Sequence, residues 1–133
     1  MKISNQILRE ALRVSRVNNT PDRHAEYGNY HHFSFLIWKG KILTWATNKN
    51  SGCSHIQFGY TSHSKTHSEF EVLRKRKNWV KLDGCAVVNV RLSKINTTKV
   101  SAPCSACKNL LQYNGIKTVY YTTENDEFER LEL

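Results

Sequence analysis

Two short segments carry residue types that bind metals and move protons. His67-Ser68-Glu69 and Pro103-Cys104-Ser105-Ala106-Cys107 each stand where the sequence predicts a helix to begin. Two cysteines spaced Cys-x-x-Cys on a first helical turn direct their sulfurs toward one point, and the positive end of the helix lowers the thiol pKa. A histidine from another helix start can complete a set of three metal ligands, which would be His67, Cys104 and Cys107.

Three protein ligands with one open position are typical of catalytic rather than structural zinc. A metal in such a site lowers the pKa of a bound water toward ~7, which supplies a nucleophile at neutral pH. Glu69 follows the histidine by two residues, so it can face the open position without binding the metal and can carry protons there. We therefore predict Zn²⁺ as the cofactor and Glu69 as the catalytic acid and base.

The same residues have plainer interpretations. A lone Cys-x-x-Cys can be a redox dithiol, and a lone histidine is most often a surface or loop residue. A structural zinc site would need a second close pair of ligands, and Cys53, His55 and His63 offer only an irregular one. Those three residues could instead hold a second metal. The joint occurrence of both motifs at predicted helix starts favours the catalytic interpretation.

Alternating helices and strands are predicted to position the two motifs. Hydrophobic spacing predicts helices at residues 3–17, 66–77 and 104–113, and strands at residues 33–38, 42–47, 86–92, 117–122 and 128–133. The polar stretches 48–64 and 93–102 are predicted to be loops. This order predicts a single α/β domain over residues 1–133, with a mixed five-stranded sheet and helices on its faces.

The chain is strongly basic. Its 133 residues include 20 Lys and Arg against 11 Asp and Glu, which gives a formal net charge of +9. Five of the acids lie from residue 124 onward, so the rest of the chain is more basic still. Such a field attracts polyanions: nucleic acid, nucleotide phosphates or an acidic membrane surface. A plain solvated surface would have the same composition.

No segment of the sequence is typical of a membrane span or a signal peptide. The longest apolar run, residues 35–38, is far too short to cross a bilayer, and the N-terminal segment has no apolar core. We expect a cytoplasmic protein with no membrane partner. In that reducing compartment the four cysteines are free thiols or metal ligands rather than disulfides, and Cys85, at the start of an apolar strand, is a small core residue.

His-x-Glu followed by Pro-Cys-x-x-Cys resembles the signature of the zinc-dependent cytidine deaminase superfamily. The resemblance extends over residues 33–122 in the order of the elements. It implies the three-layer cytidine deaminase-like fold and hydrolytic deamination of a nucleobase, with zinc on the three ligands and Glu69 as proton shuttle. It also implies that Asn48 holds the sugar of the substrate. The further candidates for substrate contact are Lys49, Ala102, Pro103 and Tyr121.

The spacing of the last two predicted strands indicates a subtype. Only residues 123–127 separate them, which allows an antiparallel hairpin but not a parallel crossover. Free cytidine deaminases and several bacterial toxin deaminases have this hairpin, whereas deaminases of deoxycytidylate, of transfer RNA adenosine and of the antiviral DNA-editing type run these strands parallel. Residues 102–111 are also similar to free cytidine deaminases. The resemblance therefore implies conversion of cytosine to uracil in a nucleoside or nucleotide.

One departure from that subtype keeps a second substrate class open. Free cytidine deaminases carry Asn-x-Glu after the second strand, where this chain has Asn48-Lys49-Asn50. A carboxylate there would repel a phosphate, whereas Lys49 would attract one. The alternative substrate is therefore cytosine, or with less support adenine, in single-stranded DNA or RNA. A second alternative is a non-catalytic nucleic-acid-binding module with structural zinc. The oligomeric state stays open.

Two further groups of residues have both a functional and a plain interpretation. A basic run followed by Trp79 fits a surface that tracks a single-stranded backbone with one stacking ring, and also fits a solvated helix end. The nucleic-acid contacts would be Lys65, Arg74, Lys75, Arg76 and Lys77. His31 and His32 precede the first predicted strand, where a loop borders the pocket in the superfamily. Both are equally interpretable as surface residues.

Overall fold

The computed structural model describes residues 2–20, 30–52, 56–60 and 65–133. Its helices are α1 (Asn5–Val17), α3 (Ser68–Lys75) and α4 (Ser105–Tyr113), with short 3-10 helices η1 (Ile56–Phe58) and η2 (Leu82–Gly84). Its strands are β1 (Tyr30–Trp38), β2 (Lys41–Thr47), β3 (Lys49–Gly52), β4 (Lys65–Thr66), β5 (Cys85–Ser93), β6 (Thr98–Lys99), β7 (Thr118–Thr122) and β8 (Phe128–Glu132).

The main sheet is mixed and has the strand order β2-β1-β5-β7-β8, with β6 paired to β5. β1 is antiparallel to both β2 and β5, β5 is parallel to β7, and β7 is antiparallel to β8. Lys39 and Gly40 connect β1 to β2, and both have positive φ values, 48° and 72°. That combination defines the tight hairpin turn whose twist matches the flanking strands, and it explains the glycine.

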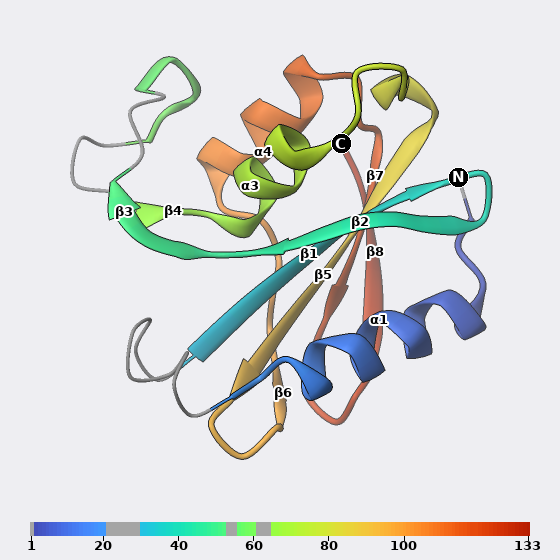
Figure 1. Ribbon diagram of the computed structural model, residues 1–133, viewed down its shortest axis with the longest axis vertical. Coiled ribbons are helices and arrows are strands. Elements are labelled where there is room, and N and C mark those ends of the chain that lie inside the picture. The colour runs from blue at the N-terminus through green and yellow to red at the C-terminus, as the bar shows by residue number, and fades with distance from the viewer. Residues whose placement is uncertain (1, 21–29, 53–55, 61–64) are drawn as a thin grey trace.

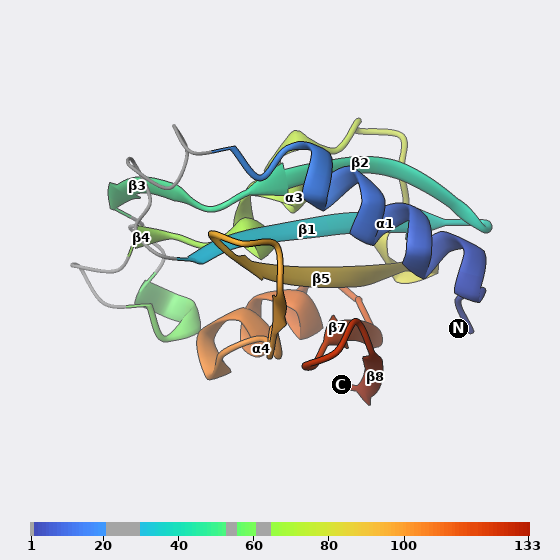
Figure 2. The same ribbon diagram turned by 90° about the horizontal axis from the view of Figure 1, so that it is seen from below.

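Helices cover both faces of this sheet (Figures 1 and 2). Alternate residues of β1 point to opposite faces, as a strand requires. Phe33, Phe35 and Ile37 pack in a cluster with α1, whereas Leu36 packs in the other cluster with α3 and α4. The protein therefore has three layers, with α1 on one side and α3 and α4 together on the other.

The predicted α/β class and the antiparallel hairpin of the last two strands are confirmed. The predicted strand count is wrong, because within the described residues the main sheet has six strands rather than five. The extra strand is β6, whose two residues pair with Arg91 and Leu92 of β5 inside the segment predicted as loop. The other predicted loop contains β3, which pairs with β4. Strands this short leave no hydrophobic alternation for sequence analysis to detect.

None of the helices in the described part of the chain is long and apolar enough to cross a membrane. The longest of them, α1, has 13 residues, and a span needs about 20.

Glu71 ties α3 to β3 and so helps to position the helix that carries His67 and Glu69. Its side chain is buried, and its Oε2 lies 3.1 Å from Nζ of Lys49 and 2.9 Å from Nη2 of Arg74. Burial raises the pKa of this carboxyl, but hydrogen bonds from Arg74 and Lys49 outweigh that effect and hold the pKa below its ordinary value. A charged carboxylate therefore fixes β3 against the first turn of α3.

Replacing Glu71 with Gln should destabilise the protein. The substitution keeps the shape but removes the charge that two cations share, and a hydrogen bond to a charged group contributes about 1.5–3 kcal/mol. We expect the free energy of unfolding in urea at pH 7 to fall by about 1–3 kcal/mol. Glu10→Gln is the matched control, since it removes an exposed i,i+3 pair with Arg13 and should change stability little. Equal losses in the two variants would contradict the role of Glu71.

Candidate active site

The starts of α3 and α4 meet and bring the three predicted metal ligands together. Nδ1 of His67 lies 3.6 Å from Sγ of Cys104 and 3.3 Å from Sγ of Cys107. In the described residues no other His, Cys, Asp or Glu side chains form such a cluster of three or more. His67 is the N-cap of α3 but makes no capping hydrogen bond, so its ring faces the sulfurs instead. The two helix starts thus form one cluster of two thiol donors and one imidazole donor.

One of the two sulfurs is already prepared to bind a metal. Hydrogen bonds, chiefly with Cys107 and next with His67, lower the pKa of the Cys104 thiol to about 4 and outweigh the opposing effect of partial desolvation. Cys104 is also the N-cap of α4, where its sulfur accepts a hydrogen bond from the backbone N–H of Cys107 at 3.5 Å. The pKa of Cys107 is raised, because its proton is held in the hydrogen bond to Cys104 and because it is buried. Cys104 is therefore a thiolate at neutral pH.

Tyr60 supports this cluster from behind. Its hydroxyl lies 2.7 Å from Sγ of Cys107, and its ring meets the His67 ring edge-to-face with centroids 5.2 Å apart. A phenol is a stronger donor than a thiol, so the hydroxyl donates to the sulfur. Tyr60 is 3% exposed and orients two of the three donors. Sequence analysis missed it because it lies in a polar stretch without hydrophobic periodicity.

The donor set fits zinc. One imidazole nitrogen and two thiol sulfurs are ligands that zinc prefers, and metal-ligating residues are typically held by outer hydrogen bonds of the kind Tyr60 makes. Glu69 is not part of the donor cluster. The described residues therefore supply three ligands, which leaves room for a fourth, non-protein ligand.

Glu69 lies beside the donors with both of its carboxylate oxygens occupied. It is 7% exposed; its Oε2 accepts a hydrogen bond from Nδ2 of Asn89 at 3.0 Å, and its Oε1 contacts Oγ of Ser68 at 3.3 Å. Burial is the main cause that raises the pKa of Glu69. A raised carboxyl pKa is typical of groups that exchange protons near neutral pH.

A closed ring of hydrogen bonds orients this carboxyl group. Nδ2 of Asn89 faces two acceptors, Glu69 and the carbonyl of Ser101, so its Oδ1 must face Ser34, whose hydroxyl donates to it at 2.7 Å. The Oγ atoms of Ser34 and Ser68 are 2.7 Å apart, so the single hydroxyl proton of Ser68 is shared between Ser34 and Oε1 of Glu69, which lies 3.3 Å away. All of these side chains are buried. The ring joins β1, β5 and α3 and fixes the position of Glu69.

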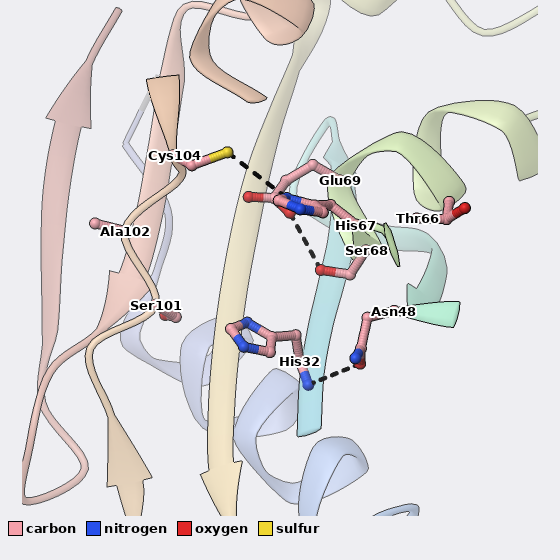
Figure 3. Close-up of a pocket in the computed structure, with 9 residues that line it drawn as sticks. All are labelled: His32, Asn48, Thr66, His67, Ser68, Glu69, Ser101, Ala102 and Cys104. Carbon is pink, nitrogen blue, oxygen red and sulfur yellow. Dashed lines mark hydrogen bonds between the residues drawn. The ribbon is translucent and has the colours of Figure 1, made fainter. Parts of the chain in front are cut away.

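A cavity of about 220 Å³ opens next to the donors and Glu69. The residues that line it are His32, Asn48, Thr66, His67, Ser68, Glu69, Ser101, Ala102 and Cys104 (Figure 3). An apolar cavity of about 150 Å³ can bind one benzene ring, and drug-sized ligands need about 300–1,000 Å³. The cavity therefore has the size of a single heteroaromatic ring with small substituents.

Asn48 and His32 form one wall of the cavity. Oδ1 of Asn48 accepts a hydrogen bond from the backbone N–H of His32 at 3.1 Å, which leaves Nδ2 as the amide donor for a ligand. Burial, with a smaller effect of Arg91, lowers the pKa of His32 to about 4. His32 is thus neutral at pH 7 and offers one donor and one acceptor.

The structure separates the other predicted site residues. Ala102 lines the cavity, and Pro103 is buried directly before Cys104. Lys49 pairs with Glu71 at the side of α3. Tyr121 is not among the residues that line the cavity, and its hydroxyl donates to Glu129 at 2.8 Å. Cys53, His55, His63 and the side chain of Lys65 lie outside the described part of the chain.

The basic run lies away from this cavity, at the opposite end of α3. Arg74 pairs with Glu71, Nζ of Lys75 donates to the carbonyl of Trp45, and Arg76 donates to the carbonyl of Leu73. Lys77 is exposed. None of the four lines the cavity beside the metal donors.

No known protein-family model matches this sequence, and no curated protein does. A solved structure, cytidine deaminase from Burkholderia pseudomallei, is similar with a TM-score of 0.63. The similarity covers 98% of this chain and 93% of that one, at 17% sequence identity. This chain has the cytidine deaminase fold. The fold predicted from the His-x-Glu and Pro-Cys-x-x-Cys segments is thereby confirmed.

The metal assignment predicts one zinc bound by His67, Cys104 and Cys107 of the cytidine deaminase fold. Cys104→Ser should lower the zinc content, measured by elemental analysis after dialysis, by one ion per chain. It should also lower the melting temperature, because metal binding and folding are linked. Cys85→Ser is the matched control: Cys85 is buried but lies outside the donor cluster, so zinc content should stay at the wild-type level. Full zinc in the Cys104 variant would contradict the assignment.

The hydrogen-bond ring predicts that Asn89 positions Glu69. Asn89→Leu removes the donor to Oε2 while keeping a similar volume, so Glu69 should lose its fixed orientation. If the site deaminates a nucleobase, kcat should fall roughly 10- to 100-fold, with KM and zinc content little changed. Ser34→Ala, which touches Asn89 but not Glu69, should have a smaller effect of the same kind. A variant with normal kcat would show that the ring has no part in catalysis.

Proposed function

We propose that this protein is a zinc-dependent hydrolytic deaminase that converts the cytosine base of a small nucleoside or nucleotide to uracil, with release of ammonia. The observation that carries the proposal is the placement of a buried, raised-pKa carboxyl group beside three zinc-type donors, at the wall of a cavity sized for one ring. The cytidine deaminase fold supports it, as does the His-x-Glu and Pro-Cys-x-x-Cys pattern.

Each residue around the cavity has a distinct task in this reaction. His67, Cys104 and Cys107 would hold zinc, which would supply an activated water as the nucleophile. The oxygen of that water would bond to C4 of the base, and Glu69 would carry its two protons in turn, one to the ring nitrogen N3 and one to the exocyclic amine. The C4–N bond would then break, ammonia would leave, and the oxygen would remain as O4 of uracil. Oε1 is the oxygen suited to this exchange, because its contact with Ser68 at 3.3 Å is longer than the Asn89 bond that anchors Oε2 at 3.0 Å.

The cavity walls hold the base and leave the sugar outside. A volume of about 220 Å³ accommodates a pyrimidine more readily than a whole nucleoside. Nδ2 of Asn48 and the neutral ring of His32 lie at this wall and are available to hydrogen-bond the sugar or the base edge. Any phosphate would then lie at the mouth, in the field of a protein with a formal net charge of +9.

Two alternatives compete with this proposal. A nucleic-acid-binding module with structural zinc would need four protein ligands, and the described residues bring three together. A binding module would also have no use for the buried carboxyl group of Glu69 beside the metal donors. Deamination of cytosine in single-stranded nucleic acid uses the same catalytic residues and differs only outside the cavity, where the basic run supports it.

The test is product analysis with the zinc-loaded protein. Cytidine, deoxycytidine, their monophosphates, adenosine and single-stranded DNA and RNA are each incubated with it, and uracil-containing or inosine products are separated and counted. We expect uridine or deoxyuridine products from the small cytosine substrates. Failure to deaminate any cytosine substrate, with zinc bound and the fold intact, would overturn the proposal.

Glu69→Gln should abolish most of that activity. The substitution keeps the size and the hydrogen-bonding capacity of the side chain but removes its exchangeable acidic proton. General acid–base groups contribute roughly 10²–10⁴-fold to the rate, so kcat should fall by a factor of at least about 10². Zinc content should stay at the wild-type level, because Glu69 lies outside the donor cluster. A variant that deaminates at the wild-type rate would exclude Glu69 as the proton carrier.

A further inference from the structure

A second cavity, of about 250 Å³, lies at the C-terminal end of α3, beside β2. It shares no residue with the catalytic cavity. Its walls combine apolar side chains with Thr44, Lys75, Arg76, Lys77 and Trp79, and we call these five residues the basic cleft. α3 has eight residues, so at 1.5 Å per residue the two cavities are separated by a helix of about 12 Å.

The charge of the basic cleft is not balanced by nearby acids. In the described part of the chain Lys75, Arg76 and Lys77 make no ion pair. Basic residues at a helix C-terminus complement the helix dipole, and the hydrogen bond of Arg76 to the carbonyl of Leu73 in the last turn of α3 fits that role. Nζ of Lys75 instead donates to the carbonyl of Trp45 on β2. The helix dipole leaves Lys77 unexplained. It also does not explain Nε of Arg76, which is buried and has no hydrogen-bond acceptor among the described residues.

Trp79 gives the basic cleft an exposed aromatic face. It is 62% exposed, and its ring meets Trp38 edge-to-face with centroids 5.7 Å apart. Trp38 in turn carries Nζ of Lys39 over its ring at 4.5 Å. The edge contact holds the indole in place without covering it. An immobilised, exposed indole beside unpaired cations is the combination that stacks a base and neutralises its phosphates.

Positive residues also connect the basic cleft to the catalytic cavity. Lys49 follows Asn48, which lines that cavity, and both Lys49 and Arg74 reach the same oxygen of Glu71. One carboxylate between two cations leaves a net positive charge there. Cations therefore follow one another from Lys49, the neighbour of the cavity residue Asn48, through Arg74 to the basic cleft at the C-terminal end of α3.

We propose that the basic cleft binds single-stranded nucleic acid, with one base stacked on Trp79 and the adjoining phosphates at Lys75, Arg76 and Lys77. An acidic protein segment would use the cations but not the indole face, and a free mononucleotide would not use the series of cations along α3. The binding itself is independent of the proposed deamination. Only the further consequence, that a bound strand delivers a cytosine to the catalytic cavity, rests on that function.

The test is binding of fluorescently labelled single-stranded DNA and RNA oligonucleotides to the zinc-loaded protein, followed by anisotropy at several salt concentrations. Each phosphate contact contributes a slope of about −0.7 to log K against log salt. Three contacts predict a total slope of roughly −2. Lys75→Gln combined with Lys77→Gln should reduce that slope by about 1.4. Lys94→Gln combined with Lys117→Gln removes the same charge from exposed residues elsewhere and should leave the slope nearly unchanged.

Trp79→Ala should weaken binding roughly 5- to 150-fold, the range that loss of one base–aromatic stack produces. Tyr113→Ala is the matched control, since Tyr113 is 79% exposed but lies outside the basic cleft. The Tyr113→Ala protein should bind the oligonucleotide with the affinity of the wild type. Thermal melting of each variant verifies the fold, and the Lys75/Lys77 variant tests the proposal even where Trp79→Ala is unstable.

Several results would overturn the proposal. These are no binding of oligonucleotides at low salt, equal losses in the cleft variants and their controls, or competition by cytidine monophosphate or polyglutamate as effective as by an unlabelled strand. Glu69→Gln separates this proposal from the proposed function, because it should lose deamination while still binding strands. Strand binding that depends on Trp79, without deamination of any substrate, would reject the proposed function alone.

Discussion

Burial of the Glu69 carboxyl group beside the metal donors is the constraint on which the rest of the site depends. A buried carboxyl without partners is costly, so its position requires donors that reach it inside the protein. Asn89 supplies one from the central strand β5, and Ser34 on β1 fixes the orientation of Asn89. β5 therefore holds the Glu69 carboxyl group directly, and β1 holds it through Asn89. Glu69 itself lies on α3, and side chains positioned by helices and strands are held more closely than side chains on loops.

The metal donors depend on a second constraint, the meeting of two helix starts. α3 and α4 pack against each other on one face of the sheet, and each begins at the same edge of the cavity. His67 occupies an N-cap position without making the usual capping bond, which leaves its ring for the cluster. Cys104 does cap its helix through sulfur. The cost of an uncapped start at α3 is offset in part by Glu69 and Glu71 in its first turn, where acidic groups favour the helix dipole.

Sequence reasoning predicts the parts of the candidate site that have a local signature. The three donors and Glu69 were predicted from spacing at helix starts, and the terminal hairpin from a loop too short for a crossover. Tyr60 and the two-residue strands were missed because neither leaves a periodic pattern. Asn89 did leave a signal: it is the one polar residue inside the run Ala86–Val90 of a strand predicted to be interior, and a buried amide must have partners. Which partners it has depends on the packing of β1 and α3 and could not be read from the chain.

The position of Lys49 changes how the departure from Asn-x-Glu bears on substrate choice. From sequence alone, a lysine in that motif attracts phosphate at the sugar site itself. In the structure its ammonium group pairs with Glu71 on α3, and the same carboxylate holds Arg74. The pairing with Glu71 therefore weakens the attraction of Lys49 for a phosphate near the cavity. Lys49 instead adds to the positive charge that continues along α3 toward the basic cleft. A mononucleotide with its base in a cavity of about 220 Å³ would reach only the near end of that series of cations, because α3 extends about 12 Å beyond it. Only a ligand of several nucleotides would meet both Lys49 and Trp79, so the length of α3 would separate the two proposed substrate classes.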